Sequence, residues 1–174
     1  MDAAADPAYY DQVKRAAVEV LKLINPAQQP YGTELFDSLC RLTVTVAIEA
    51  VCLRRNTETG EVEALLTQRR HDDTAYPGEW HFPGSVKRPG ELDEQVLARL
   101  AKDEFCTQIL RKRFVENYDM PHADRGHFLH LVYLCEVAEE AKGTWYPVDL
   151  LPEKIVHFHR DRYIPMAVRA FSSP

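Results

Sequence analysis

The segment that decides the fold is residues 80–106, Trp80-His-Phe-Pro-Gly-Ser-Val-Lys-Arg-Pro-Gly-Glu-Leu-Asp-Glu-Gln-Val-Leu-Ala-Arg-Leu-Ala-Lys-Asp-Glu-Phe-Cys106. Pro-Gly pairs at 83–84 and 89–90 interrupt regular structure before Glu91. The following residues, up to Phe105, include no Gly or Pro and are rich in good helix formers. Their apolar side chains recur at helical spacing and form one stripe, made by Val96, Leu97, Leu100, Ala101 and Phe105. The segment therefore predicts a loop that runs into an amphipathic helix.

The same segment resembles the signature of the Nudix hydrolases, Gly-x5-Glu-x7-Arg-Glu-hydrophobic-x-Glu-Glu-x-Gly-hydrophobic. Glu91, Arg99 and Glu104 match its first Glu, its Arg and its last Glu without a gap. Trp-x-Phe-Pro-Gly at 80–84 and Gln-Arg-Arg at 68–70 are also similar to the family. The resemblance extends over about residues 42–171 and implies an α+β fold, with a mixed β-sheet sandwiched between α-helices.

The segment departs from the signature at five positions. Leu100 replaces the Glu that follows the Arg, and Asp103 replaces the next Glu. Ser85 replaces the opening Gly, Cys106 the closing Gly and Thr107 the last hydrophobic residue. In the family those Glu residues hold divalent metal ions. Because Leu100 replaces one of them, only two of the three metal-binding carboxylates remain here.

The resemblance implies a metal site at the start of this segment and on the helix. Carboxylates three or four positions apart share a helix face and can converge on one hard cation. By resemblance, Glu104, Asp103 and the Ser85 carbonyl hold Mg²⁺ or Mn²⁺, and Glu104 and Asp103 are the catalytic carboxylates. Arg99 and Glu91 form an ion pair that braces the loop against the helix.

Cationic side chains surround the signature in sequence. Arg69, Arg70 and Arg88 are predicted to bind the substrate, because guanidinium groups grip phosphate oxygens through paired hydrogen bonds. An equally weighted alternative is that they only solvate the ends of a strand and a loop.

Two functions remain open at this stage. The first is a Nudix-type pyrophosphohydrolase that cleaves a nucleoside diphosphate linked to another moiety, with activity weakened by Leu100. The second is a catalytically impaired Nudix-fold module that binds a nucleotide or sugar-nucleotide as a sensor or partner. Both predict a small, nucleotide-like ligand, and the sequence leans towards the enzyme.

The composition of the chain limits the classes of protein to which it can belong. The chain has 174 residues, of which 45% are hydrophobic, and a net charge of −6. This size suits one domain with a real core, and the negative charge argues against binding long nucleic acids or anionic membranes. The N-terminus lacks a signal peptide and no apolar run is long enough for a membrane helix, so we expect a cytoplasmic protein. The four cysteines are scattered, which predicts free thiols.

The sequence divides into an N-terminal helical extension, residues 1–41, and a Nudix-like domain, residues 42–174. In the extension, Asp6-Pro7 predicts the start of a helix to about Ile24, and a loop at 25–32 precedes a short helical segment at 34–39. We expect the extension to pack on the domain; covering a site or forming a homodimer surface are the alternatives. In the domain, strands are predicted at 42–53, 62–68 and 127–137, a loop at 120–126, a β-like segment at 155–159 and a closing helix at 161–171.

Overall fold

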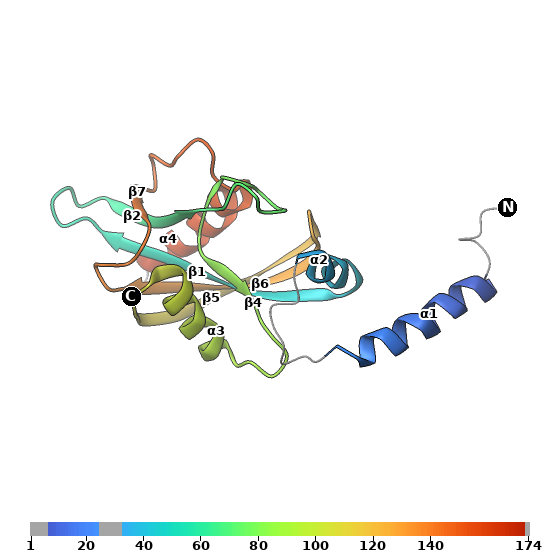
Figure 1. Ribbon diagram of the computed structural model, residues 1–174. Helices are drawn as coiled ribbons and strands as arrows, with labels where there is room; N and C mark the ends of the chain where they lie inside the picture. The colour runs from blue at the N-terminus through green and yellow to red at the C-terminus, as the bar shows by residue number, and fades with distance from the viewer. Residues whose placement is uncertain (1–6, 25–32, 173–174) are drawn as a thin grey trace. The chain divides into compact units, whose positions relative to one another are not determined.

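The computed structural model describes residues 7–24 and 33–172, and its contacts divide the chain into two units, residues 1–32 and 33–174 (Figure 1). The first unit holds α1 (Pro7–Lys22), so the predicted helix is confirmed but ends two residues early. The predicted start at Asp6 and the loop at 25–32 lie outside the described residues. Helix α2 (Thr33–Leu42) belongs to the second unit, and packing of the first unit on the second stays a prediction. In the described ranges, no helix is both long and apolar enough to cross a membrane.

A mixed β-sheet forms the second unit, which confirms the predicted α+β fold (Figure 1). Its main strand order is β3-β2-β1-β6-β5, in which β1 and β6 are parallel and the other neighbours antiparallel. Two short strands lie off this path, β4 beside β1 and β7 beside β2. The strands are β1 (Val44–Arg55), β2 (Val62–Gln68), β3 (Trp80–His81), β4 (Gly84–Val86), β5 (Ile109–Ala123), β6 (Gly126–Val137) and β7 (Thr144–Pro147).

One face of the sheet is covered by α3 (Asp93–Leu100) and the π-helical turn η2 (Ala101–Phe105). Alternate residues of β1, among them Ile48 and Ala50, point to this face and pack against Val96, Leu97 and Leu100. Complete burial of one such leucine stabilises the fold by roughly 1.5–3 kcal/mol. The predicted amphipathic helix is therefore confirmed, with Leu100 inside the core.

The opposite face is covered by the π-helical turn η3 (His159–Tyr163) and α4 (Ile164–Ser172). Residues Val51 and Leu53 of β1 contribute to this second core. Pro165 does not end the helical segment, which runs from His157 to Ser172; it directly follows the π-helical turn η3, where the N–H of Ile164 bonds to the carbonyl of His159. The expectation of a β-like segment at 155–159 holds only for Ile155, which bridges Trp80; the chain is helical from His157.

The prediction of a loop at 120–126 is wrong, since β5 continues to Ala123 and only two residues connect it to β6. Three register shifts along the β5–β6 pair explain the error. Each shift moves the following side chains to the other face, so that the regular alternation of a strand is lost from the sequence.

Cys106 ends the helical segment with a positive φ of 54°, in the left-handed region that favours glycine. It occupies the position where the Nudix signature has its closing Gly, and the backbone explains why that position takes glycine.

We expect Cys106→Gly to raise the free energy of unfolding by about 1 kcal/mol, because the variant removes the cost of a side chain in this conformation. Urea denaturation measures the effect. Cys106→Ala is the matched control, because it removes the thiol but keeps the Cβ; an equal gain in that variant would show that the thiol, not the backbone, is responsible.

Candidate functional site

The signature loop is held against α3 by a bidentate ion pair. Arg99 donates from Nε and Nη2 to the two carboxylate oxygens of Glu91, at 3.2 and 2.9 Å. The same guanidinium also donates to the Ser85 hydroxyl and to the Val86 carbonyl. Burial alone would raise the pKa of Glu91, but its hydrogen bonds from Arg99 and from the Arg88 backbone lower it overall. The structure thus brings Arg99, Glu91 and Ser85 together at the junction of β4 and α3.

The two signature carboxylates lie in η2, the turn that follows α3. Asp103 is exposed and Glu104 is half-buried, and neither makes a hydrogen bond or ion pair to another described residue. Leu100, at the position of the missing Glu, is 2% exposed in the core under α3. In the part of the chain that the structure describes, no three His, Cys, Asp or Glu side chains come together in a way that could hold a metal ion. The roles of Asp103, Glu104 and Ser85 as metal ligands stay predictions.

The three arginines predicted to bind substrate have different surroundings. Arg69 is mostly buried and lines a cavity. Arg70 is exposed and forms a paired hydrogen bond with Asp72 at the surface. Arg88 is half-buried beside Glu91 and does not line the cavity. Arg69 alone is in a position to contact a ligand in this cavity.

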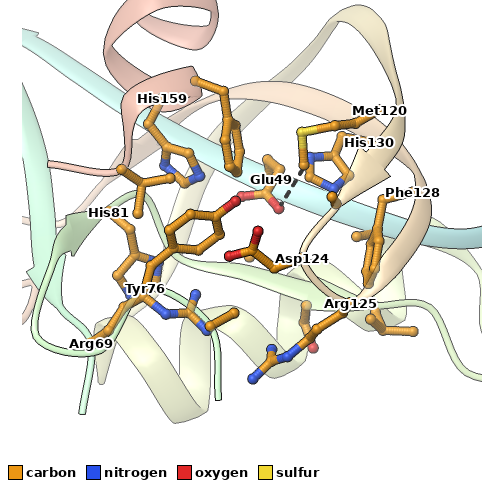
Figure 2. A pocket seen from close by; sticks show the side chains of 18 of the residues that line it. Glu49, Arg69, Tyr76, His81, Met120, Asp124, Arg125, Phe128, His130 and His159 are labelled. Carbon is orange, nitrogen blue, oxygen red and sulfur yellow. Dashed lines mark ion pairs between the residues drawn. The ribbon is translucent and has the colours of Figure 1, made fainter. Parts of the chain in front are cut away.

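That cavity has a volume of about 150 Å³, and Figure 2 shows the side chains that line it. Its lining residues from β1, Ala47 and Glu49, are on the strand face opposite the one that packs against α3. Its walls come from α2, from strands β1, β3, β4, β5 and β6, from the β2–β3 loop and the β5–β6 turn, and from the segment around His159. The apolar part of the lining includes Phe36, Tyr76, Met120, Phe128 and Phe158. Its polar part consists of Glu49, Arg69, His81, Ser85, Asp124, Arg125, His130 and His159. A concave site with apolar walls and a few convergent polar groups is typical of a small-molecule site.

Glu49, in the middle of β1, points its carboxyl group into this cavity (Figure 2). It shares a face of β1 with Ala47, Val51 and Leu53, all of which are buried. Its side chain is only 9% exposed, and the closest ionisable nitrogen, Nδ1 of His130, is 3.8 Å away. Removal from water raises the pKa of Glu49 to about 8, even though the charge of Arg69 acts in the opposite direction. The carboxyl is therefore largely protonated at neutral pH.

Three histidines line the same cavity and stay neutral. Nδ1 of His130 is hydrogen-bonded to the Tyr163 hydroxyl, and Nδ1 of His159 accepts from the Phe82 N–H at 2.9 Å. Burial lowers the pKa of His130 to about 4 and that of His81 to about 4, and it also lowers the pKa of His159. These rings shape the inner wall without adding charge at neutral pH.

Two arginines that line the cavity, Arg69 and Arg125, meet on one carboxylate. Asp73, in the β2–β3 loop, pairs with Arg69 at 2.6 Å and with Arg125 from the β5–β6 turn. Arg125 also lies 3.3 Å from Asp37 of α2. The Nε–H of Arg69 is a buried donor without an acceptor among the described residues.

The NUDIX domain family profile matches residues 45–166, well over half of the chain. The chain belongs to the Nudix family. Comparison with curated protein sequences finds no match.

Solved Nudix structures have the same fold at low sequence identity. The NUDIX domain of Shewanella oneidensis NrtR, in a cocrystal with ADP ribose, has a TM-score of 0.59 at 15% identity and covers 89% of this chain and 98% of that one. The longer NrtR chain has a TM-score of 0.59 at 16% identity, and the match spans 72% of this chain but only 62% of that chain. A MutT NUDIX hydrolase from Burkholderia pseudomallei has a TM-score of 0.56 at 22% identity, with 68% and 95% covered. At these identities the likeness shows the Nudix fold.

Sequence reasoning missed the polar residues of the cavity. The sequence analysis singles out neither Glu49 nor His130 as a site residue. A signal for Glu49 was present, since alternate positions 47, 51 and 53 of the same Nudix strand are apolar. A lone carboxylate in an apolar strand face indicates a buried group with a role.

The Glu91–Arg99 pair is expected to stabilise the domain measurably, because both side chains are mostly buried and the contact is bidentate. A double-mutant cycle with Glu91→Gln and Arg99→Lys should give a coupling of about 1–3 kcal/mol at neutral pH. Because the fold lowers the pKa of Glu91, the coupling should be present above its ordinary pKa of 4.5 and disappear as the pH falls through the lowered value. A coupling that is absent at neutral pH would contradict the assignment.

Proposed function

We propose that this Nudix domain is a binding module that holds a nucleotide-like small molecule in the cavity around Glu49. The observation that carries the proposal is Leu100, which is 2% exposed in the core at the position where the signature has a Glu. A core leucine leaves the metal site without one of its carboxylates. Two adjacent side chains, Asp103 and Glu104, are a poor substitute, since a hard cation in a protein site usually takes several oxygen ligands in a fixed geometry.

The cavity supports the same proposal. Aromatic walls can hold a planar base, and the N–H groups of Arg69 and Arg125 can bind phosphate oxygens. The NUDIX domain of NrtR, whose fold this chain shares, was crystallised with ADP ribose. A nucleoside diphosphate linked to a second group is therefore the first ligand class to test.

A second candidate is metal-dependent hydrolysis of the same ligand class, with Mg²⁺ or Mn²⁺. It is favoured by the half-buried Glu104 and by the intact Glu91–Arg99 pair beside Ser85. In that case the metal would supply a bound water as nucleophile and neutralise charge on the diphosphate, with Glu104, Asp103 and Ser85 as its protein ligands.

One experiment separates the two candidates. Nucleoside diphosphate sugars, dinucleoside polyphosphates and nucleoside triphosphates are incubated with the protein in Mg²⁺, Mn²⁺ or chelator, and both phosphate-bond cleavage and the melting temperature are measured. The binding module predicts a ligand-induced rise in melting temperature that persists in chelator, without turnover. Metal-dependent turnover that Glu104→Gln abolishes, with unchanged folding, would contradict it and support the hydrolase.

A further inference from the structure

Arg69 uses only half of the edge with which its guanidinium group can grip an anion. Its Nη2 donates to Oδ2 of Asp73 at 2.6 Å, but its Nε is buried and has no acceptor among the described residues. A buried donor without a partner is uncommon in folded proteins and requires an explanation. Because Arg69 also lines the cavity, a group of the ligand is the first acceptor to consider.

Two other arginines of the chain show what this edge does when it is filled. Arg99 donates from Nε and Nη2 to both carboxylate oxygens of Glu91, and Arg70 donates from the same two atoms to both oxygens of Asp72. The Nε–Nη2 edge of a guanidinium group matches two oxygens of one anion. On Arg69 only one of these two positions is occupied.

Asp73 cannot fill the second position, because its oxygens already have other donors. Oδ1 of Asp73 accepts from Nη2 of Arg125 and from the N–H of Ala75, whereas Oδ2 accepts from Arg69. Arg69 and Arg125 both line the cavity, whereas Asp73 does not (Figure 2). A flat carboxylate outside the cavity thus bridges the two guanidinium groups and leaves the Nε–H of Arg69 unsatisfied.

A phosphate group suits the two arginines better than this carboxylate does. Two of its terminal oxygens can accept from Nε and Nη2 of Arg69 while the third accepts from Arg125, and it carries up to twice the charge. Arg125 lies 3.3 Å from a second carboxylate, that of Asp37, so it keeps an anionic partner if Asp73 leaves. A phosphate that bound while Asp73 stayed would bring two anions together on the same cations, where they repel each other.

The loop that carries Asp73 is held by contacts that such an exchange would break. Asp73 fixes the N–H of Ala75 and pairs with Arg125, and the next residue but one in the loop, Tyr76, has a φ of 53° in the left-handed region. This conformation is unfavourable for a residue with a Cβ and persists only where the surroundings impose it. Release of Asp73 removes two of the contacts that impose it.

We propose that a phosphate group of the ligand takes the place of Asp73 on Arg69 and Arg125. The inference rests on the proposed function, because it assigns the phosphate subsite of the same ligand. Asp73 is then an internal competitor that lowers the affinity of the cavity, since its ion pairs with both arginines open before the phosphate binds.

The test is a calorimetric titration with inorganic pyrophosphate, in chelator at neutral pH. Asp73→Asn removes the competing charge and should bind pyrophosphate about tenfold more tightly than the unmodified protein. Asp72→Asn is the matched control, because this neighbouring carboxylate is exposed and pairs with Arg70, which does not line the cavity; its affinity should be unchanged. Arg69→Lys keeps the charge but loses the two-point edge, and it should bind about tenfold more weakly.

Two further measurements separate exchange from a purely structural role of Asp73. Without ligand, Asp73→Asn should melt at a lower temperature, because both arginines lose their shared partner, and pyrophosphate should raise its melting temperature more than that of the unmodified protein. A crystal structure of the unmodified protein with pyrophosphate needs no variant. It should show phosphate oxygens on Nε and Nη2 of Arg69, with Asp73 turned away from both arginines.

The exchange is overturned, and the proposed binding function left standing, if Asp73→Asn binds pyrophosphate no more tightly than the unmodified protein. A bound pyrophosphate with Asp73 still on Arg69 has the same meaning. If pyrophosphate binds to none of the proteins although a nucleotide of the ligand panel raises the melting temperature, the exchange fails alone. If neither pyrophosphate nor any member of the panel binds, the proposed function itself fails.

Discussion

The unmodified protein is expected to lose much of its free energy of unfolding as the pH rises from about 4.5 to about 8, and Glu49→Gln is expected to abolish this pH dependence. In the unfolded chain this carboxyl ionises near its ordinary pKa of 4.5, whereas in the fold burial raises the pKa to about 8. Its contribution to stability is therefore fully present below pH 4.5 and is lost as the pH rises towards 8. The slope over this window is about 1.4 kcal/mol per pH unit. A neutral amide of the same shape has no such slope.

Chemical denaturation of both proteins at several pH values from 5 to 9 measures the effect. The buried histidines act in the opposite direction, since their lowered pKa values make the fold gain stability as the pH rises to about 6.5. Their contribution is common to both proteins and cancels in the difference. If the difference in unfolding free energy between the two proteins does not change with pH, Glu49 is not buried as described.

Leu100→Glu restores the signature residue but is expected to destabilise the domain by about 3–5 kcal/mol or prevent folding. The side chain is enclosed by Ile48, Val96, Leu97 and Phe105 without a cationic partner among these contacts. The variant loses the packing of a core leucine and places an unpaired carboxylate in apolar surroundings.

Two controls show whether burial is the cause. Leu100→Met preserves the volume and should cost less than about 1.5 kcal/mol. Ala98→Glu adds the same carboxylate to an exposed position of α3 and should be tolerated. A folded Leu100→Glu protein with raised metal-dependent turnover would show instead that position 100 can reach a working metal site.

The sequence was sufficient for the parts of the fold that depend on local spacing. The loop and helix at 80–106 and the β1–β2 hairpin were predicted from breakers and periodicity, and both are confirmed. The pairing of Arg99 with Glu91 follows from the spacing of the signature, and the structure places these side chains in contact. The roles of Asp103, Glu104 and Ser85 in metal binding stay predictions.

The cavity could not be derived in the same way, because its residues come from distant parts of the chain. Alternation in β1 separates two faces but does not say that both are covered, so Glu49 looked like a residue of a solvated face. His130 is far from Glu49 in sequence, and only the parallel pairing of β6 with β1 brings the two side chains together. Asp73 and Arg125 are 52 positions apart and meet only because the fold brings the β2–β3 loop to the β5–β6 turn.

The most direct test of the central claim is a crystal structure of the protein, grown in chelator, with the nucleotide of the panel that raises its melting temperature most. The account predicts that the nucleotide occupies the cavity around Glu49, with its phosphates near Arg69 and Arg125 and without a divalent cation. A nucleotide bound instead beside Glu104 on η2, or one that binds only when Mg²⁺ or Mn²⁺ is added, would contradict it.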